Sequence, residues 1–347
     1  MNKYHKPAEL YDGLRLHQNE NTGVCSPKVL DALRSLRADQ IGFYPPYEST
    51  TTVCAEYLGV APDRLSLLNG LDEGIMATAV GYLRPTAGGG PAEAVVPEPA
   101  FEIFAFDTEV VGGRPVRVAP NPDFSFPLER VLEAITANTR VVFLTNPNNP
   151  TGMAMPNEAI RAVARAVPAE AVVFVDEAYA EFSGVTFIPE LAAFPNVLVG
   201  RTFSKAFGLA GLRIGAITGA PGALEPIRLA VPVYSVNIAA TVAVEAALRD
   251  RDYLNGYLRQ VEESKSLLYA ACDRLGLTYC RSAANFVLVC AGDRLNAIVN
   301  GAAARGIYLR DRSGEPGCGG CLRIATGVVE HTRRCIDVME DILCAAR

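Results

Sequence analysis

Short, almost wholly apolar runs alternate with amphipathic stretches between residues 94 and 216 of the chain. Apolar runs of this length are typical of strands buried on both faces of a parallel sheet, and the amphipathic stretches are typical of helices that cover such a sheet. Residues 156–167, which begin with proline, and residues 127–136 have the helical pattern. The predicted strands are residues 94–97, 116–119, 140–145, 171–176, 196–200 and 215–219.

A second alternation follows residue 239 and predicts a smaller region of mixed helices and strands. It begins with one long helical stretch that ends at about residue 275. Outside this region, residues 86–91 are expected to form a glycine-rich turn. The remaining predicted elements of the second region are a strand at 285–290, a helix at 294–305, strands at 307–309 and 321–325, a glycine-rich loop at 313–320 within it, and a final helix from residue 331.

Together the two patterns predict an α/β fold, with a mostly parallel central sheet flanked by helices and a smaller α+β C-terminal domain. In open parallel sheets, ligands bind outside the carboxyl ends of the strands. We therefore expect the functional site among the polar residues that follow the predicted strands. The expected domains are residues 1–40 as an N-terminal arm that forms part of the small domain, residues 41–245 as the large domain, and residues 246–347 as the small C-terminal domain.

The composition is that of a globular protein with an acidic balance. Of the 347 residues, 50% are apolar, and the net charge is −6. This balance argues against broad binding to nucleic acid or to anionic membranes, which requires clustered lysine and arginine. No apolar run approaches the roughly 18 residues of a membrane span, and no signal-like apolar stretch is found at the N-terminus. We therefore expect a cytoplasmic protein that binds neither nucleic acid nor membranes.

The chain has 9 cysteines and 3 histidines. An odd number of scattered cysteines favours reduced thiols over a disulfide framework. Cys318 and Cys321 form a C-x-x-C pair, but no second pair accompanies them, and the histidines are too few to complete a zinc site. We expect no metal, and we expect most cysteines to be small core residues.

A polar, cationic segment at residues 201–215 lies between two apolar runs. Within it, Lys205 follows small hydroxyl residues and precedes an apolar Ala-Phe-Gly-Leu-Ala sequence. Partial burial at this position disfavours the charged form of lysine and makes the neutral, nucleophilic amine more accessible. A lysine in this environment is suited to forming a Schiff base, and Arg213 in the same segment is suited to binding an anion.

Asp176 ends a predicted strand of otherwise apolar residues, where a carboxylate is costly unless it meets a cation. A protonated ring nitrogen would meet that need, and a cap for the next helix is the other interpretation of this residue alone. Residues 146–152, Asn-Pro-Asn-Asn-Pro-Thr-Gly, have the composition of a simple turn. Amides held rigidly between prolines are also suitable donors to a phenolate or carboxylate oxygen.

In their order along the chain, these motifs resemble those of the fold type I pyridoxal-phosphate aminotransferases, and most closely those of the histidinol-phosphate aminotransferases within that group. The resemblance extends from Arg15 to about Leu343. Each motif is short, but their number and order together are specific. The motifs are Asn19-Glu20-Asn21, Tyr44-Pro45, residues 69–74, 148–152, 176–179 and 201–215, Leu309-Arg310-Asp311, and residues 321–324.

The resemblance implies that pyridoxal 5′-phosphate is the cofactor and that Lys205, Asp176 and Tyr179 are catalytic. Lys205 would form the internal aldimine and then move a proton between the substrate Cα and C4′ of the cofactor. Asp176 would keep the pyridinium nitrogen protonated, so that the ring accepts electrons. Asn149 and Tyr179 would hydrogen-bond the 3′ oxygen of the cofactor, and Phe101 would stack on its ring.

The cofactor phosphate, by the same resemblance, would be held at the N-terminus of a helix and by side chains of the cationic segment. Tyr44 would reach this phosphate from the other subunit, which implies a homodimer with a shared active site. The implied phosphate-binding groups are the backbone amides of Leu71 and Asp72, the hydroxyls of Thr202 and Ser204, and Arg213.

The substrate-binding residues implied by the resemblance are Arg323, Arg310 and Asn21. Arg323 matches the arginine that binds an α-carboxylate, a bidentate task that lysine performs poorly. Arg310 matches a residue near the far end of the substrate, and taken alone it is also compatible with an exposed surface arginine.

The sequence departs from the family pattern in a few places. Leu71 replaces a small serine or alanine, and Phe101 replaces a tyrosine. Thr22 and Gly23 stand where the family often has proline and an aromatic or aliphatic residue. These positions lie on the substrate-facing side of the expected site more than on the side that holds the cofactor. The departures therefore bear on which substrate is expected more than on which reaction class is expected.

We therefore expect a transaminase that works by two ping-pong half-reactions between an amino donor and a 2-oxo acid, with L-histidinol phosphate and 2-oxoglutarate as the expected pair. An aromatic or other α-amino acid of a specialised pathway is the alternative donor. Decarboxylation on the same fold is a further enzymatic alternative. The non-enzymatic alternative is a ligand sensor or regulator on this fold. A regulator of this kind would carry a DNA-binding domain, and we expect none because family-like sequence begins by about Arg15.

Overall fold

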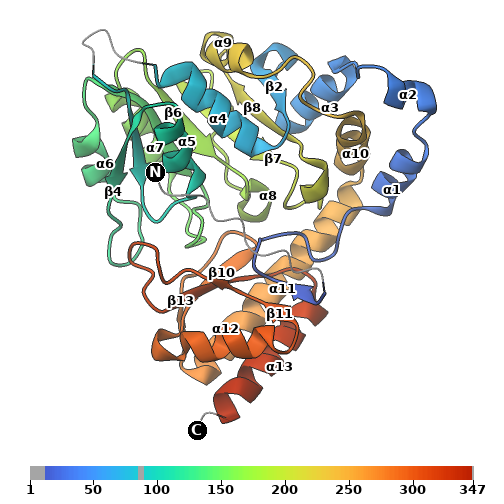
Figure 1. Cartoon of the computed structure of the whole chain (residues 1–347), viewed down its shortest axis with the longest axis vertical. Coiled ribbons are helices and arrows are strands. Elements are labelled where there is room, and N and C mark those ends of the chain that lie inside the picture. Colours follow the sequence, from blue (N-terminus) through green and yellow to red (C-terminus); the bar gives the residue numbers. More distant parts are fainter. Residues whose placement is uncertain (1–11, 85–89, 346–347) are drawn as a thin grey trace.

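The computed structural model describes residues 12–84 and 90–345 of the chain. A large sheet with its covering helices forms the broad upper part of the molecule in Figure 1, and a small sheet with two long helices forms the narrow lower part. The glycine-rich turn expected at residues 86–91 lies mostly outside the described residues, as do residues 1–11 of the expected N-terminal arm.

The large sheet has 7 strands in the order β2-β8-β7-β6-β5-β3-β4. The strands from β7 through β4 pair in parallel, whereas β8 is antiparallel to both of its neighbours. The prediction of a mostly parallel sheet is confirmed, and every strand predicted for it is present; β2 was not predicted. The bounds are β2 (Leu65–Leu68), β3 (Glu93–Pro97), β4 (Arg114–Val118), β5 (Thr139–Thr145), β6 (Val172–Asp176), β7 (Val197–Thr202) and β8 (Gly215–Gly219).

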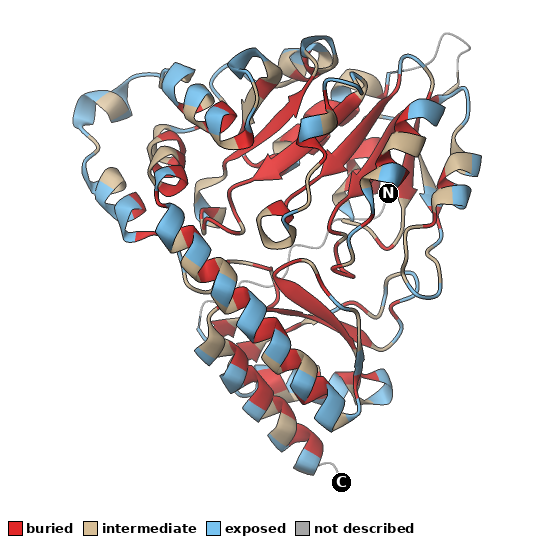
Figure 2. Cartoon of the chain, turned by 180° about the vertical axis from the view of Figure 1, so that it is seen from behind, coloured by how far each residue is buried: buried red, intermediate tan, exposed pale blue. Residues whose placement is uncertain are grey.

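Both faces of this sheet are buried under helices, as the red strands of Figure 2 show. In β5, Val142 and Leu144 belong to one apolar cluster, and Val141 and Phe143 belong to the other. This alternation follows from the two-residue period of a strand. One face is covered by α4 (Leu71–Tyr82), α5 (Ile103–Val110) and α9 (Pro221–Ala230), and the other by α1 (Pro27–Arg34), α3 (Glu48–Leu58), α6 (Leu128–Ala134), α7 (Asn157–Ala166) and α10 (Ile238–Arg249).

The small sheet is antiparallel throughout, in the order β12-β13-β10-β9. Its Val287, Val289, Leu322 and Ile324 side chains pack into a second core with the flanking helices. A short parallel pair, β1 with β11, joins the segment after residue 12 to this region. The bounds are β1 (Leu14–Arg15), β9 (Thr278–Tyr279), β10 (Phe286–Cys290), β11 (Ile307–Tyr308), β12 (Arg310–Asp311), β13 (Cys321–Ala325), α11 (Arg251–Leu275), α12 (Leu295–Ala303) and α13 (Val329–Ala345).

The long helix predicted from residue 239 to about residue 275 is two helices, α10 and α11, that meet at Asp250. The backbone of Asp250 leaves the helical region, with φ −99° and ψ 67°. Its carboxylate accepts hydrogen bonds from Ser26 and from Lys28, the latter at 2.9 Å. These hydrogen bonds therefore attach the start of α1 to the junction between α10 and α11. The domain boundaries at residues 40 and 245 stay a prediction.

The expectation of reduced thiols is wrong for two cysteines. Cys290 and Cys321 are directly paired across β10 and β13, and they form a disulfide. Antiparallel register brings the two side chains together on one face of the sheet, a relation that sequence spacing does not reveal. The free cysteines among the described residues are Cys25, Cys54, Cys272, Cys280, Cys318, Cys335 and Cys344.

Within residues 12–84 and 90–345, no helix is both long enough and apolar enough to cross a membrane. The same residues contain no group of histidine, cysteine, aspartate and glutamate side chains that could hold a metal ion.

Candidate active site

A cavity of about 370 Å³ lies where the carboxyl ends of β5, β6 and β7 face the small sheet. Its wall includes Thr145, Asp176 and Thr202 from these strand ends, as the ligand position in parallel sheets predicts. The other lining residues are His17, Gln18, Asn19, Glu20, Leu71, Asp72, Ile75, Phe101, Glu102, Asn149, Ala178, Tyr179, Ser204, Lys205, Ala210, Gly211, Arg213, Arg310, Arg312 and Arg323.

Lys205 lies in the turn after β7, and its side chain is partly buried. Burial, followed by the positive charge of Arg323, lowers the pKa of Lys205 to about 8. The Nζ atom donates a hydrogen bond to the Gln18 carbonyl oxygen at 3.0 Å. A substantial fraction of this amine is therefore neutral near pH 8, in agreement with the desolvated lysine predicted from the sequence.

Asp176 ends β6, and its side chain is buried in the same cavity. One carboxylate oxygen accepts a hydrogen bond from the Ala178 amide at 2.9 Å. Burial nevertheless raises the pKa of Asp176 to about 7, and the negative charge of Asp72 adds to this effect. A cation next to this carboxylate would lower its pKa again, so the site favours a positively charged group at this point.

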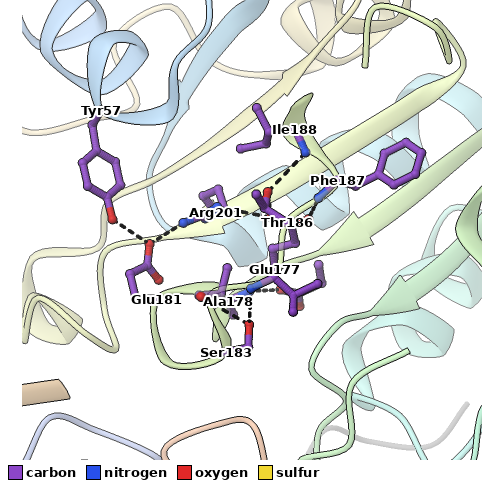
Figure 3. Close-up of polar contacts among 12 residues, drawn as sticks. Tyr57, Glu177, Ala178, Glu181, Ser183, Thr186, Phe187, Ile188 and Arg201 are labelled. Carbon is purple, nitrogen blue, oxygen red and sulfur yellow. Dashed lines mark hydrogen bonds and ion pairs between the residues drawn. The ribbon is translucent and has the colours of Figure 1, made fainter. Parts of the chain in front are cut away.

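A buried ion network surrounds Glu177, the residue that follows Asp176 in the chain (Figure 3). Arg201 of β7 pairs with Glu177 at 3.2 Å and also with Glu181. Glu177 in turn accepts hydrogen bonds from the Thr186 hydroxyl and the Phe187 amide, both at 2.6 Å. Burial lowers the pKa of Arg201, but the two carboxylates outweigh burial and raise the pKa above its usual value. The network thus fixes the backbone that continues from β6 into the cavity.

A cradle of polar groups suited to an anion lies where α4 begins. The first backbone amides of a helix have no partner within the helix, and Leu71 and Asp72 occupy these positions at the edge of the cavity. Gly70 precedes them with φ +80°, and a Cβ atom there would lie 2.4 Å from Nη2 of Arg213. Arg213 itself pairs with Asp72 at 3.0 Å.

Two hydroxyl residues at the end of β7 complete this cradle. The Thr202 hydroxyl accepts a hydrogen bond from the Ser204 amide at 3.2 Å. The Ser204 hydroxyl is buried and has no hydrogen-bond partner within the described residues. A buried hydroxyl without a partner is costly, so this end of the cavity is suited to a polar ligand such as a phosphate.

Asn149 and Tyr179 both line the cavity, and a hydrogen bond orients a polar side-chain atom of each. The side-chain Oδ1 atom of Asn149 accepts a hydrogen bond from Arg323 at 2.5 Å, which leaves the side-chain Nδ2 atom available as a donor. The Tyr179 hydroxyl accepts from the Asn19 side chain at 3.0 Å, and its ring packs edge-on against Phe286. Burial raises the pKa of Tyr179.

Arg323 and Arg310 are paired directly across β13 and β12, and both line the cavity. Arg323 is buried, and its second nitrogen donates to the His17 carbonyl oxygen at 2.7 Å. Its guanidinium carbon lies 5.4 Å from the centre of the Phe286 ring. The side chain of Arg310 forms no hydrogen bond or ion pair within the described part of the chain, although its backbone pairs in the sheet. The wall formed by the small sheet is therefore strongly cationic.

The family model of the class I and II aminotransferases matches residues 11–337. The chain belongs to this aminotransferase family. The prediction of an enzyme with a pyridoxal-phosphate-dependent transaminase activity is thereby confirmed at the level of the family. The non-enzymatic alternative has no support from this match.

Several relatives of this aminotransferase have names that include a substrate. The histidinol-phosphate aminotransferase of Symbiobacterium thermophilum is 36% identical over 340 residues, which cover 96% of this chain and 91% of the relative. Histidinol-phosphate aminotransferase 2 of Carboxydothermus hydrogenoformans is 33% identical over 341 residues, or 95% of this chain and 91% of the relative.

Solved structures have the same fold. The histidinol-phosphate aminotransferase of Sinorhizobium meliloti, in complex with pyridoxal 5′-phosphate, superposes with a TM-score of 0.87 at 27% identity and covers 97% of this chain and 92% of that one. The aspartate aminotransferase of Thermus thermophilus with maleate superposes with a TM-score of 0.79 at 23% identity, over 95% of this chain and 92% of that one. The predicted fold type I architecture is confirmed.

Two of the predicted site residues of this aminotransferase do not line the cavity. Asn21 is buried, but its amide donates to the Ala206 carbonyl oxygen at 3.0 Å and accepts from the Gly23 amide at 2.8 Å. It therefore holds the turn that follows Lys205. Tyr44 is exposed and stacks on Tyr234, with ring centroids 4.1 Å apart.

Several residues of the cavity were not among the predicted site residues, and Asn19, His17 and Arg312 are three of them. Asn19 orients Tyr179, and His17 supplies both a carbonyl to Arg323 and a buried imidazole whose pKa is lowered by burial. Arg312 adds a third arginine to the cationic wall. The spacing of Arg310 and Arg312 carried a signal, because residues two apart in a strand face the same side. Asn19 belongs to the Asn19-Glu20-Asn21 motif of the family resemblance, whereas His17 carried no signal, because its neighbours in the site come from distant parts of the chain.

Proposed function

We propose that this aminotransferase transfers an amino group between L-histidinol phosphate and 2-oxoglutarate, with pyridoxal 5′-phosphate in the cavity that contains Lys205 and Asp176. The observation that carries the proposal is the position of Arg323 and Arg310 on adjacent strands of the same cavity. Two guanidinium groups side by side suit both a dianionic phosphate and a dicarboxylate such as 2-oxoglutarate. The names of the relatives support the choice of substrate pair.

The residues present fit this cofactor. Its protonated ring nitrogen would supply the cation that the buried Asp176 requires. The Ser204 hydroxyl is buried and has no hydrogen-bond partner among the described residues, and the cofactor phosphate would supply one. Arg213 and the first backbone amides of α4 would bind the same phosphate. When bound, the cofactor supplies an electron-accepting ring conjugated to the substrate amine.

The residues of this chain then have separate tasks. Lys205, as a neutral amine, would take the proton from the α-carbon of the amino donor, and in the reverse half-reaction it would give a proton to the α-carbon of the amino acid formed from the 2-oxo acid. Asn149 and Tyr179 donate to the ring oxygen of the cofactor and orient it; the Arg323 contact holds the Asn149 amide in place. Phe101, which lines the cavity and packs edge-on against Phe104, covers the ring.

Arg323 is proposed to bind the α-carboxylate of glutamate or 2-oxoglutarate, and Arg310 the far anionic end of the substrate. Asn21 supports the substrate side indirectly through its contact with Ala206. The proposed small-molecule partners are therefore an amino donor and a 2-oxo acid, each with an anionic group that faces the small sheet.

We also propose a homodimer in which Tyr44 reaches the cofactor phosphate of the other subunit. The support is an exposed apolar patch near Tyr44, consisting of Ile41, Phe43, Tyr44, Val233 and Tyr234, with Phe43 76% and Val233 80% exposed. Apolar side chains gathered in this way on a surface mark an interaction site. A cytoplasmic location stays a prediction, which fractionation of cells tests.

The reaction is tested with Lys205→Ala, which should lose both transamination and the near-visible absorption of the lysine-bound cofactor. Lys265→Met is a matched control, because Nζ of Lys265 is also buried and bonds a carbonyl oxygen, that of Ser282, at 3.0 Å. Lys265 lies outside the lining of the cavity. Activity and absorption in Lys205→Ala equal to those of the control would refute the assignment.

The substrate is tested by an assay of histidinol phosphate, phenylalanine, tyrosine and arginine as donors to 2-oxoglutarate. We expect the highest kcat/KM for histidinol phosphate, with one glutamate formed per oxo product and no carbon dioxide. If histidinol phosphate is inactive while an aromatic donor reacts, the substrate is wrong and the reaction class stands. Release of carbon dioxide would indicate a decarboxylase.

A further inference from the structure

Arg312 is a buried arginine of the cavity wall that the reaction described above does not use. It follows β12 directly, and its amide donates to the Cys321 carbonyl oxygen at 3.0 Å, so it continues the pairing of β12 with β13. Because side chains alternate along a strand, Arg312 is on the same face as Arg310. Its side chain is only 6% exposed, yet it lines the cavity.

The hydrogen-bonding capacity of Arg312 is only partly used. One terminal nitrogen pairs with Glu315. The other is 3.9 Å from Glu102, which is beyond hydrogen-bond distance, and Nε is buried without any partner in the described residues. A guanidinium has five N–H donors, and buried donors are costly when they have no acceptor.

The surroundings of Arg312 are short of negative charge. Burial, together with the positive charges of Arg323 and Arg310, lowers the pKa of Arg312 to about 10. Glu102 opposes this effect, but its side chain is half exposed. Three guanidinium groups therefore share one wall of the cavity, and an anionic ligand is the group that would relieve their mutual repulsion.

We propose that Arg312 is a specificity-determining residue that binds the phosphate group of the amino donor together with Arg310. The proposal rests on the proposed function and extends it to a residue that the family pattern did not indicate. Arg310 and Arg312 offer two cations to the anionic group of the donor, which suits a dianionic phosphate better than a single carboxylate. Glu315 orients the Arg312 guanidinium through one nitrogen and leaves the others for the substrate.

The experiment compares Arg312→Gln with Arg312→Lys, Glu315→Gln and the control Arg274→Gln. Arg274 belongs to the same region and pairs with Glu340, but its side chain is 59% exposed and lies outside the cavity lining. For each variant, the kcat/KM of histidinol phosphate is divided by that of its uncharged analogue, L-histidinol. This ratio cancels losses of folded protein and of cofactor.

We expect Arg312→Gln to lower the ratio by about tenfold to a hundredfold, chiefly through KM, because a charged hydrogen bond to the phosphate is lost. Arg312→Lys should recover part of the loss. Glu315→Gln, which keeps an oxygen acceptor for Arg312, should lower the ratio by less than Arg312→Gln does, and only Arg274→Gln should stay within about twofold of the unmodified enzyme. If Arg312 only paired with Glu315, then Arg312→Gln and Glu315→Gln would change the ratio equally, and that result would overturn the proposal.

Failure of the proposed function has a different signature. If the unmodified enzyme does not use histidinol phosphate, the same variants are compared with glutamate, whose far end is a carboxylate, and with phenylalanine. A selective loss toward glutamate in Arg312→Gln would support the role of Arg312 with a different substrate. An unchanged preference in Arg312→Gln would refute that role, whichever donor the enzyme uses.

Discussion

At the scale of single residues, the burial of Lys205 decides when its amine is free to react. The pKa of Lys205 is lowered to about 8, so the amine is mostly protonated below this pH and mostly neutral above it. The rate at which apo-protein captures pyridoxal phosphate, followed by near-visible absorbance, should fall about tenfold per pH unit well below pH 8. It should level off above pH 8. A rate that keeps rising to pH 10 would contradict this prediction.

The positive charge of Arg323 is the second cause of the lowered pKa. Arg323→Gln should therefore move the midpoint of the capture profile to higher pH. Arg333→Gln serves as the control, because this arginine is exposed and pairs with Glu263 outside the cavity. Equal midpoints in both variants would mean that burial alone sets the pKa of Lys205.

At the scale of elements, Arg201 joins the ends of β6 and β7 to the segment that carries Tyr179. Arg201→Leu would leave Glu177 and Glu181, which are both buried, without their cation. We expect the free energy of unfolding to fall by about 3–5 kcal/mol. The measurement is urea unfolding, with Arg274→Leu as an exposed control that should lose less than about 1 kcal/mol.

The loss in Arg201→Leu should depend on pH. Burial already raises the pKa of Glu177, and removal of Arg201 takes away the largest opposing effect. A carboxyl whose pKa is raised in the folded state stabilises the fold below its unfolded pKa and loses that contribution as the pH rises. The difference from the unmodified protein should therefore be smaller at pH 5 than at pH 8. The same difference at both values would exclude buried carboxylates as its cause.

The elements that could be predicted from the sequence are those whose pattern is local. The central strands are continuous apolar runs, so their positions and the site at their carboxyl ends, with Lys205 and Asp176, followed from the sequence. The break at Asp250 could not be predicted, because its cause is a contact with Ser26, 224 residues away. The same holds for the pairing of Cys290 with Cys321, which depends on strand register.

At the scale of the whole molecule, an apolar patch near α2 (Ala38–Gly42) remains exposed in the single chain. Ile41, Phe43 and Tyr44 contribute from one segment, and Val233 and Tyr234 from another, and stacking of Tyr44 on Tyr234 joins the two. Figure 1 shows α1 and α2 at the outer edge of the large part, away from the small sheet. An edge of this kind is suited to a second copy of the chain.

Sedimentation should therefore give about twice the chain mass of 37.1 kDa. A double substitution, Ile41→Glu with Phe43→Glu, would place buried charge at the interface and should yield monomers. Because Tyr44 is proposed to complete the site of the other subunit, the monomers should also bind pyridoxal phosphate more weakly. Val110→Glu is the control, since Val110 is an exposed apolar residue of α5 outside the patch. Monomers that retain full cofactor affinity would separate assembly from the active site, and Tyr44 would then have no role in it.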